Sequence, residues 1–178
     1  NEDSTRFRAS VLAQTLKEMG INLNFAPVVD LNVNPESPAI GALGRSFSAN
    51  PDTVVFHAGI FIDEHNKRMI LNCCKHFPGH GSATSDSHLG LTDVTNTWSE
   101  MELEPYRQLI TSGKCQMVMS AHVFNQNLDA DYPATLSKKI LTGILREKLG
   151  FNGVIVSDAM EMGAITDYYG QEEAIEKA

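Results

Sequence analysis

The stretch Gly153-Val-Ile-Val-Ser-Asp158 decides the fold, because it places a short apolar strand after a helical run and a carboxylate at the end of that strand. The helical run begins at Ser137, a favourable N-cap residue, and stops at Gly150. The same order of helix, strand and polar residue occurs four times along the chain. This alternation predicts an α/β fold with a parallel sheet, either covered on both faces or closed into a barrel.

Apolar runs and their flanking residues predict the positions of these elements. Strands are expected at residues 24–29, 69–74, 116–121 and 153–156, and helices at 7–19, 50–62, 99–112 and 137–149. Ser99 and Glu102 have the spacing of a capping box for the third helix. The first helix has apolar residues at helical spacing, namely Phe7, Val11, Leu12, Leu16 and Met19.

The composition is that of an ordinary globular protein and excludes several classes of partner. The 178 residues carry a net charge of −8 and are 42% hydrophobic, and this length suggests a single domain. An acidic chain without a Lys/Arg cluster argues against binding to nucleic acid or an anionic membrane. No apolar run reaches the roughly 20 residues of a membrane-spanning helix. The cysteines, Cys73, Cys74 and Cys115, are odd in number and are expected to be free thiols.

Polar side chains follow every predicted strand. Asp30 follows the first strand, Lys75 and His76 the second, His122 the third and Asp158 the fourth. In parallel α/β folds the carboxyl edge of the sheet is where active sites form. Any one of these residues could instead cap the next helix, but Lys75 and His76 are poor capping residues. The pattern therefore predicts an active site at this edge.

The longest loop, Lys75 to Leu91, is rich in His, Gly and Pro and is expected to carry acid/base chemistry. Asp86 lies two residues before His88, so its carboxylate can hold one ring nitrogen and leave the other for proton transfer. His76 and His80 could ligate a metal together with this pair, or the histidines could merely stabilise turns. The spacings match no common zinc pattern, so no metal is expected.

Two further residues are candidates on weaker grounds. Asp158, at the tip of a buried strand, suits a rigidly held nucleophile, but its spacing fits an N-cap equally well. Arg45 lies in the loop Gly41 to Ser48 and offers a forked donor to hydroxyl, carbonyl or carboxylate groups of a substrate.

The motifs taken together resemble glycoside hydrolase family 3, in the β-N-acetylhexosaminidase branch that includes bacterial cell-wall recycling enzymes. The resemblance is carried by Lys75-His-Phe-Pro-Gly-His-Gly81, Asp86-Ser-His88, Gly90-Leu91, Asn24-Phe-Ala-Pro-Val-Val-Asp30, Gly44-Arg-Ser-Phe47, Ser120-Ala-His-Val123 and Val156-Ser-Asp158, in the family's order. It implies a (β/α)8 TIM barrel that removes terminal β-linked N-acetylglucosamine with retention of configuration and needs no cofactor. The chain, residues 1–178, is then expected to be the central part of one barrel, about four βα units, truncated at both ends. A substrate-binding Asp-Gln-Glu-Gly-Gly-type segment of the family would precede Asn1.

The resemblance also implies roles for single residues. Asp158 would be the nucleophile that forms a covalent glycosyl intermediate, and His88 the general acid and then base, oriented by Asp86. The substrate-binding residues would be Lys75, His76, Arg45 and His122. Ser82, Thr92 and Ala159 depart from the family pattern, but none replaces a catalytic group.

The sequence leaves several alternatives open. The activity could be another one of the family, a β-glucosidase or a glycoside phosphorylase, or the chain could be an inactive carbohydrate-binding or scaffold fragment. A bacterial location in the cytoplasm, the periplasm or outside the cell is equally compatible with the sequence, and protein partners are not indicated.

Overall fold

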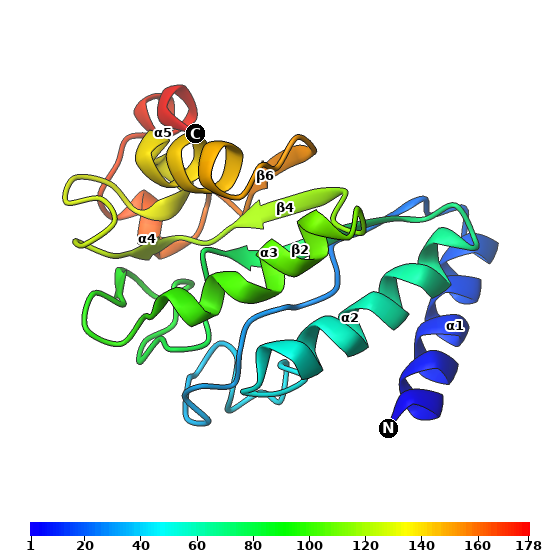
Figure 1. The fold of residues 1–178 in the computed structure, drawn as a ribbon. Helices are drawn as coiled ribbons and strands as arrows, with labels where there is room; N and C mark the ends of the chain where they lie inside the picture. The colour runs from blue at the N-terminus through cyan, green and yellow to red at the C-terminus, as the bar shows by residue number, and fades with distance from the viewer.

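A four-stranded parallel sheet forms the centre of the molecule in the computed structural model, which describes residues 1–178 apart from the side chain of residue 171 (Figure 1). The strands lie side by side in the same order as in the sequence: β1 (Leu23–Asn24), β2 (Leu71–Phe77), β4 (Met117–Ser120) and β6 (Val154–Ser157). In Figure 1 the arrowheads of β2 and β4 point to the left, which marks the carboxyl edge. Within the described residues β1 and β6 each pair with one neighbour, so both edges of this sheet are open.

Helices connect the strands and cover the sheet. Figure 1 shows α2 and α3 in front of β2 and β4, with α1 packed beside α2. The short strands β3 (Thr92–Asp93) and β5 (Val123–Phe124) form a second, parallel pair. The helices are α1 (Glu2–Glu18), α2 (Pro51–Asn66), α3 (Glu104–Thr111), α4 (Gly163–Thr166), α5 (Gln171–Lys177), the 3₁₀ turns η1 (Glu100–Leu103) and η2 (Ala134–Leu136), and η3 (Lys139–Lys148), which has π-type hydrogen bonding.

The predicted α/β class and most element starts are confirmed. The side chain of Asn50 accepts a hydrogen bond from the Thr53 amide at 3.0 Å and caps α2. The hydroxyl of Ser137 accepts the Ile140 amide at 3.1 Å at the start of η3. Gly150, just beyond η3, has a φ of +71°, the left-handed conformation that ends a helix.

Two strand boundaries differ from the prediction. The expected strand 24–29 is reduced to β1, followed by a single bridge between Val28 and Lys75, because Pro27 has no amide hydrogen to donate. The second strand runs on to Phe77, so Lys75 and His76 lie within β2 and do not follow it. The pairing of β2 with β4 is irregular between Lys75 and Phe77. Such an irregularity changes the direction of the side chains at the carboxyl end of β2.

The expected capping box at the third helix is wrong. Ser99 makes no side-chain capping bond, and the helix opens with the 3₁₀ turn η1 before α3 begins at Glu104. Glu102 is buried and accepts a hydrogen bond from the Gly81 amide at 3.1 Å. This glutamate therefore serves the loop after β2 and does not cap the start of its own helix.

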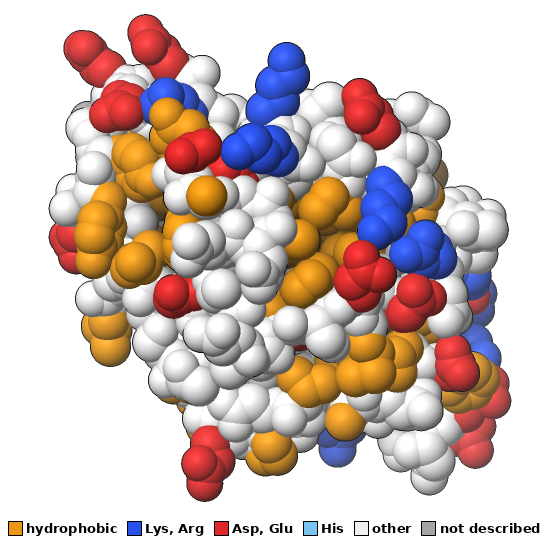
Figure 2. Space-filling model, turned by 60° about the vertical axis from the view of Figure 1, so that its left-hand side comes forward, with side chains coloured by type: hydrophobic (Ala, Val, Ile, Leu, Met, Phe, Trp, Pro, Cys, Tyr) orange, Lys and Arg blue, Asp and Glu red, His pale blue; other side chains and the backbone are white. Residues whose placement is uncertain are grey.

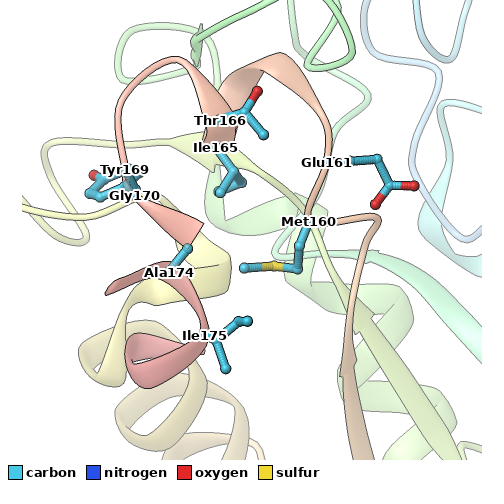
Figure 3. A pocket seen from close by; sticks show the side chains of 8 residues that line it. All are labelled: Met160, Glu161, Ile165, Thr166, Tyr169, Gly170, Ala174 and Ile175. Carbon is cyan, nitrogen blue, oxygen red and sulfur yellow. The ribbon is translucent and has the colours of Figure 1, made fainter. Parts of the chain in front are cut away.

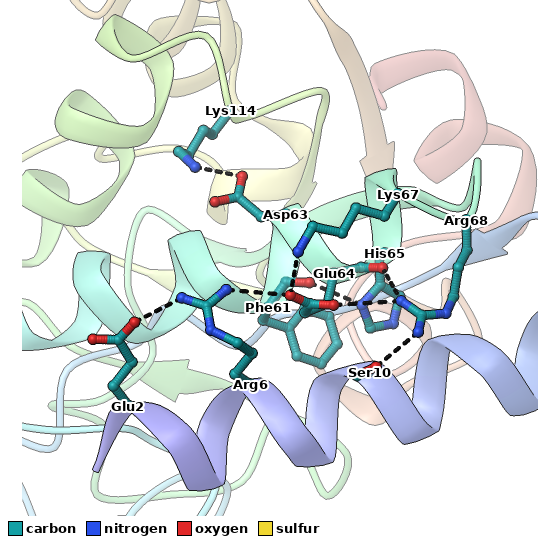
Figure 4. A network of polar contacts seen from close by, with 10 residues as sticks. All are labelled: Glu2, Arg6, Ser10, Phe61, Asp63, Glu64, His65, Lys67, Arg68 and Lys114. Atoms are coloured by element: carbon teal, nitrogen blue, oxygen red, sulfur yellow. Dashed lines mark hydrogen bonds and ion pairs between the residues drawn. The ribbon is translucent and has the colours of Figure 1, made fainter.

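The apolar face predicted for the first helix points largely to solvent. Phe7 is 71% exposed, whereas the small residues Ala9 and Ala13 are buried. Helix α1 is instead linked to α2 by the ion pair of Arg6 with Glu64, and to the turn after α2 by a hydrogen bond from Arg68 to Ser10 (Figure 4). Polar contacts between the helices thus replace the expected apolar packing of the large side chains.

The main core lies between the sheet and its helices. Phe77 of β2 and Tyr106 of α3 meet edge to face at 5.1 Å between ring centroids, and both are fully buried. The three cysteines are free thiols. No helix in the described part of the chain is long and apolar enough to span a membrane.

Candidate active site

The carboxyl ends of β2, β4 and β6 and the loop after β2 bring most predicted site residues to one edge. Asp158 follows β6 directly, and its amide donates to the Ser120 carbonyl of β4 at 3.2 Å. Its carboxylate is half-buried and accepts the Ala159 amide at 2.8 Å. Asp158 is therefore held by the backbone of two adjacent segments.

The loop that carries Asp86 and His88 is docked onto the segment that follows Asp158. The carbonyls of Ser87 and His88 accept hydrogen bonds from the amides of Ala164 and Gly163, at 3.2 and 3.3 Å. A Cβ atom at residue 163 would lie 3.2 Å from the His88 carbonyl oxygen, so glycine allows this close approach. These contacts tie the loop to the end of the sheet that bears Asp158.

Asp86 and His88 form the hydrogen-bonded pair that their spacing suggests. His88 Nδ1 lies 2.7 Å from Asp86 Oδ1, and the same oxygen accepts the His88 amide at 3.0 Å. Partial burial opposes ionisation of Asp86, but these bonds from His88 outweigh it and lower the pKa of the carboxyl. The imidazole is 61% exposed, and its Nε2 is bonded to none of the described residues. A charged acceptor thus fixes one nitrogen and leaves the other for a substrate.

His76 occupies the site but has no nitrogen free for a sugar. It is 5% exposed, and Nδ1 lies 2.6 Å from Asp30 Oδ2. Its Nε2 accepts a hydrogen bond from Arg45 at 3.2 Å, which places the ring proton on Nδ1. Direct binding of substrate by His76 stays a prediction, and in this arrangement the ring orients Arg45.

Arg45 and Lys75 keep donors available at this edge. One Arg45 nitrogen donates to the Ala39 carbonyl at 2.8 Å and another to His76, and the guanidinium remains partly exposed. Burial and the nearby Arg45 charge lower the pKa of Lys75, whereas the charge of Asp158 acts in the opposite direction. Lys75 is thus within electrostatic reach of both Arg45 and Asp158.

His122 does not present a free nitrogen either. It is buried, with Nδ1 at 2.8 Å from the Thr135 hydroxyl and Nε2 at 2.9 Å from the Ala159 carbonyl. Burial lowers the pKa of His122, so the ring is neutral and Nε2–H donates to that carbonyl. The predicted substrate contact stays a prediction, and in this arrangement His122 supports the backbone next to Asp158.

Asp30 is a buried residue at this edge for which the sequence predicted no role, although it follows a predicted strand and ends the family-like segment Asn24–Asp30. It is 1% exposed and accepts the amides of His76 and His80, the latter at 2.8 Å. Burial alone would raise its pKa, but the interactions with His76, and to a smaller extent with His80, outweigh burial and lower the pKa. Asp30 thus anchors the start of the loop to the segment that follows β1.

Glu102 also supports the loop after β2, whereas the sequence predicted it to be part of a capping box. Burial raises the pKa of its carboxyl to about 7, only partly opposed by polar contacts with Ser82 and the Gly81 amide. A Cβ atom at residue 79 would lie 2.6 Å from the Glu102 Cβ, so the loop backbone rests directly on this side chain. No periodic signal in the sequence could separate this contact from a capping box.

A separate cavity of about 550 Å³ is lined by residues of α4, α5 and the segment that follows Asp158. Figure 3 shows Met160 and Ile175 directed toward this space and Glu161 directed away from it. Its lining is mostly apolar, and none of the predicted catalytic residues contributes to it. Figure 2 shows further apolar patches exposed among charged side chains on the face seen there.

Comparison with known proteins identifies the family. Residues 2–178 match the model of the glycosyl hydrolase family 3 N terminal domain. The chain belongs to this family. It is 38% identical to beta-hexosaminidase A of Pseudoalteromonas piscicida, covering 93% of the chain and 30% of the relative, and 43% identical to a beta-hexosaminidase of Tolumonas auensis, covering 85% and 45%.

A solved structure agrees with this assignment. A family 3 beta-N-acetylglucosaminidase from a Paenibacillus species superposes with a TM-score of 0.92 and 35% identity. The match covers 100% of this chain and 34% of that one. The family 3 chain described here therefore spans less than half the length of these three relatives.

Proposed function

We propose that the full-length protein is a retaining β-N-acetylhexosaminidase and that this chain supplies its catalytic nucleophile and its acid/base. The observation that carries the proposal is the docking of the Asp86–His88 loop onto the backbone that follows Asp158. The names of the family 3 relatives support the N-acetylglucosaminide substrate. The 178 residues would form the central part of the catalytic barrel.

In the first step the Asp158 carboxylate attacks the anomeric carbon while the bond to the leaving oxygen breaks. His88, as an imidazolium stabilised by the Asp86 carboxylate, transfers its Nε2 proton to that oxygen. In the second step neutral His88 takes a proton from water, and the resulting oxygen nucleophile displaces Asp158 from the sugar. The histidine ends protonated and the carboxylate free, so the cycle closes.

The remaining residues hold the sugar and the catalytic groups. Arg45, oriented by His76, and Lys75 offer donors to hydroxyl groups of the sugar. This plan differs from the common pair of carboxylates because a histidine takes the acid/base position.

The test is hydrolysis of an aryl N-acetylglucosaminide by the full-length protein and its Asp158→Ala variant. Loss of the nucleophile is expected to lower kcat by at least about a thousandfold. Asp167→Ala, an exposed aspartate nine residues further on, is the matched control and should retain full activity. Retained activity in Asp158→Ala would refute the assignment.

Two substrate comparisons separate the alternative activities. Faster cleavage of a glucoside would indicate a β-glucosidase, and acceleration by phosphate with release of a sugar phosphate would indicate a phosphorylase. Absence of turnover in the full-length protein, with retained sugar binding, would favour the scaffold alternative.

A further inference from the structure

Two buried residues of the loop, His80 and Ser87, have no part in the mechanism above but are bonded to each other. His80 Nε2 lies 3.0 Å from Ser87 Oγ, and both residues are 3% exposed. Ser87 stands between Asp86 and His88 in the sequence, so its position fixes where both flanking side chains begin. These two residues form the His80–Ser87 bridge.

The ring of His80 has a defined protonation. Burial lowers its pKa, so the ring is neutral. Nδ1 has no hydrogen-bond partner among the described residues. An unpaired buried N–H is less readily tolerated than an unpaired acceptor, which favours the proton on Nε2. The ring therefore donates Nε2–H to the Ser87 hydroxyl oxygen.

The bridge is anchored to the sheet at its other end. The His80 amide donates to Asp30 Oδ1 at 2.8 Å, and Asp30 also accepts the amide and the ring of His76 in β2. From the buried Asp30, contacts thus run through His80 to Ser87. The bridge is one of the connections between the exposed tip of the loop and the core, beside the backbone contacts of Ser87 and His88.

We propose that His80 is a positioning residue for the acid/base, acting through Ser87 on the placement of His88. The inference rests on the proposed function, because it assumes that His88 transfers the proton. Removal of the bridge would leave His88 intact but less well aligned with the leaving oxygen. A displacement of about 1 Å can reduce a rate by about a hundredfold.

A positioning role and a purely structural role predict different substrate dependence. Cleavage of a glycoside with a poor leaving group needs proton donation, whereas a dinitrophenyl glycoside leaves without it. Loss of alignment should therefore lower kcat/KM for the poor leaving group alone. General damage to the fold would lower kcat/KM for both substrates equally.

The experiment compares kcat/KM for methyl and dinitrophenyl N-acetylglucosaminides in the full-length protein. Ser87→Ala and His80→Ala are expected to lose about 10- to 100-fold on the methyl glycoside and less than about twofold on the dinitrophenyl one. His80→Gln should recover most of the loss, because its amide nitrogen can donate from near the Nε2 position. Ser85→Ala, whose hydroxyl contacts Thr92, is the control in the same loop and should resemble the wild type.

The outcomes distinguish failure of this inference from failure of the proposed function. Equal losses on both substrates, or wild-type values for both bridge variants, would refute the positioning role. His88→Ala defines the full loss of acid catalysis. If His88→Ala itself shows no preference for the activated substrate, the proposed acid function fails, and the bridge inference fails with it. Reaction of the bridge variants with the dinitrophenyl substrate at the wild-type rate shows that they are folded.

Discussion

Glu64 and Glu102 are two buried glutamates whose surroundings shift their pKa values in opposite directions. They are 4% and 2% exposed, respectively. Lys67 holds the pKa of Glu64 below its ordinary value, with help from Arg6 and Arg68 against the cost of burial (Figure 4). Glu102 bonds the backbone amide of Gly81 and has no ion pair among the described residues, so burial raises its pKa to about 7.

The two glutamates lie in different kinds of surroundings: Glu64 belongs to an ion-pair network between helices, and Glu102 lies beneath the loop of the proposed site. Around Glu64 the cations keep much of their hydration, since Lys67 is 59% exposed, and the network joins α1 to α2. Around Glu102 the carboxyl is desolvated and supports the glycine-rich turn at the start of the loop that carries Asp86 and His88. Of these two glutamates, the one that is buried without a cation partner is therefore the one that lies beside the proposed site.

The largest effect is expected from Asp30, the buried carboxylate with the most donors at the functional edge. Asp30→Ala would leave the amides of His76 and His80 and the His76 ring without their acceptor. The expected cost is about 3–5 kcal/mol of unfolding free energy, together with loss of hydrolysis. Denaturant unfolding of the full-length protein measures it, and a cost below about 1 kcal/mol would contradict the anchoring role.

The second effect concerns the pH dependence that Glu102 confers. Its carboxyl keeps a proton in the folded state up to a pKa of about 7, above the ordinary value of 4.5, so stability falls as pH rises between these values. Glu102→Gln should remove a fall on the order of 3 kcal/mol. Unfolding at pH 5 and pH 8 compares the variant with the wild type.

The Glu102 variant also has an internal control. Glu104→Gln, two residues further on at a partly exposed position, should leave the pH slope unchanged. A Glu102→Gln protein that loses the same stability as the wild type between pH 5 and pH 8 would show that Glu102 is already ionised at the lower pH.

The smallest effect is expected from Glu64→Gln, because its cationic partners can be rehydrated. The loss should be about 1 kcal/mol at neutral pH. The pKa of Glu64 is lowered on folding, so its contribution is present above the unfolded pKa and is lost as pH falls through the folded pKa. Melting temperatures of the two proteins should therefore converge in acid, and a gap that widens in acid would contradict the ion-pair account.

The sequence predicted the sheet well because buried parallel strands are short apolar runs, and the polar residues that follow these runs mark the ends of the strands. It also indicated the Asp86–His88 pair, since a carboxylate two residues away can reach the ring through local geometry alone. The sequence did not predict the roles of residues whose partners are distant along the chain. Glu102 serves a loop twenty-one residues away, and no local pattern distinguishes that contact from a helix cap.

The first helix and the histidines show the same limit. Phe7 has the spacing of a core residue but faces solvent. Helical periodicity shows which residues share one face of a helix, but it does not show what packs against that face. His76 and His122 lie at the predicted edge, but their ring nitrogens are bonded within the chain. Position in the sequence located these side chains, whereas their roles depend on neighbours brought together by folding.

The most direct test is to identify the residue that a slow fluorinated N-acetylglucosaminide labels in the full-length protein. Such a substrate traps the covalent intermediate, and mass mapping of peptides locates the added sugar. The account predicts one sugar per protein on the peptide containing Asp158, and no label in Asp158→Ala. Labelling of a different carboxylate, or a catalytically active protein that is never labelled, would contradict it.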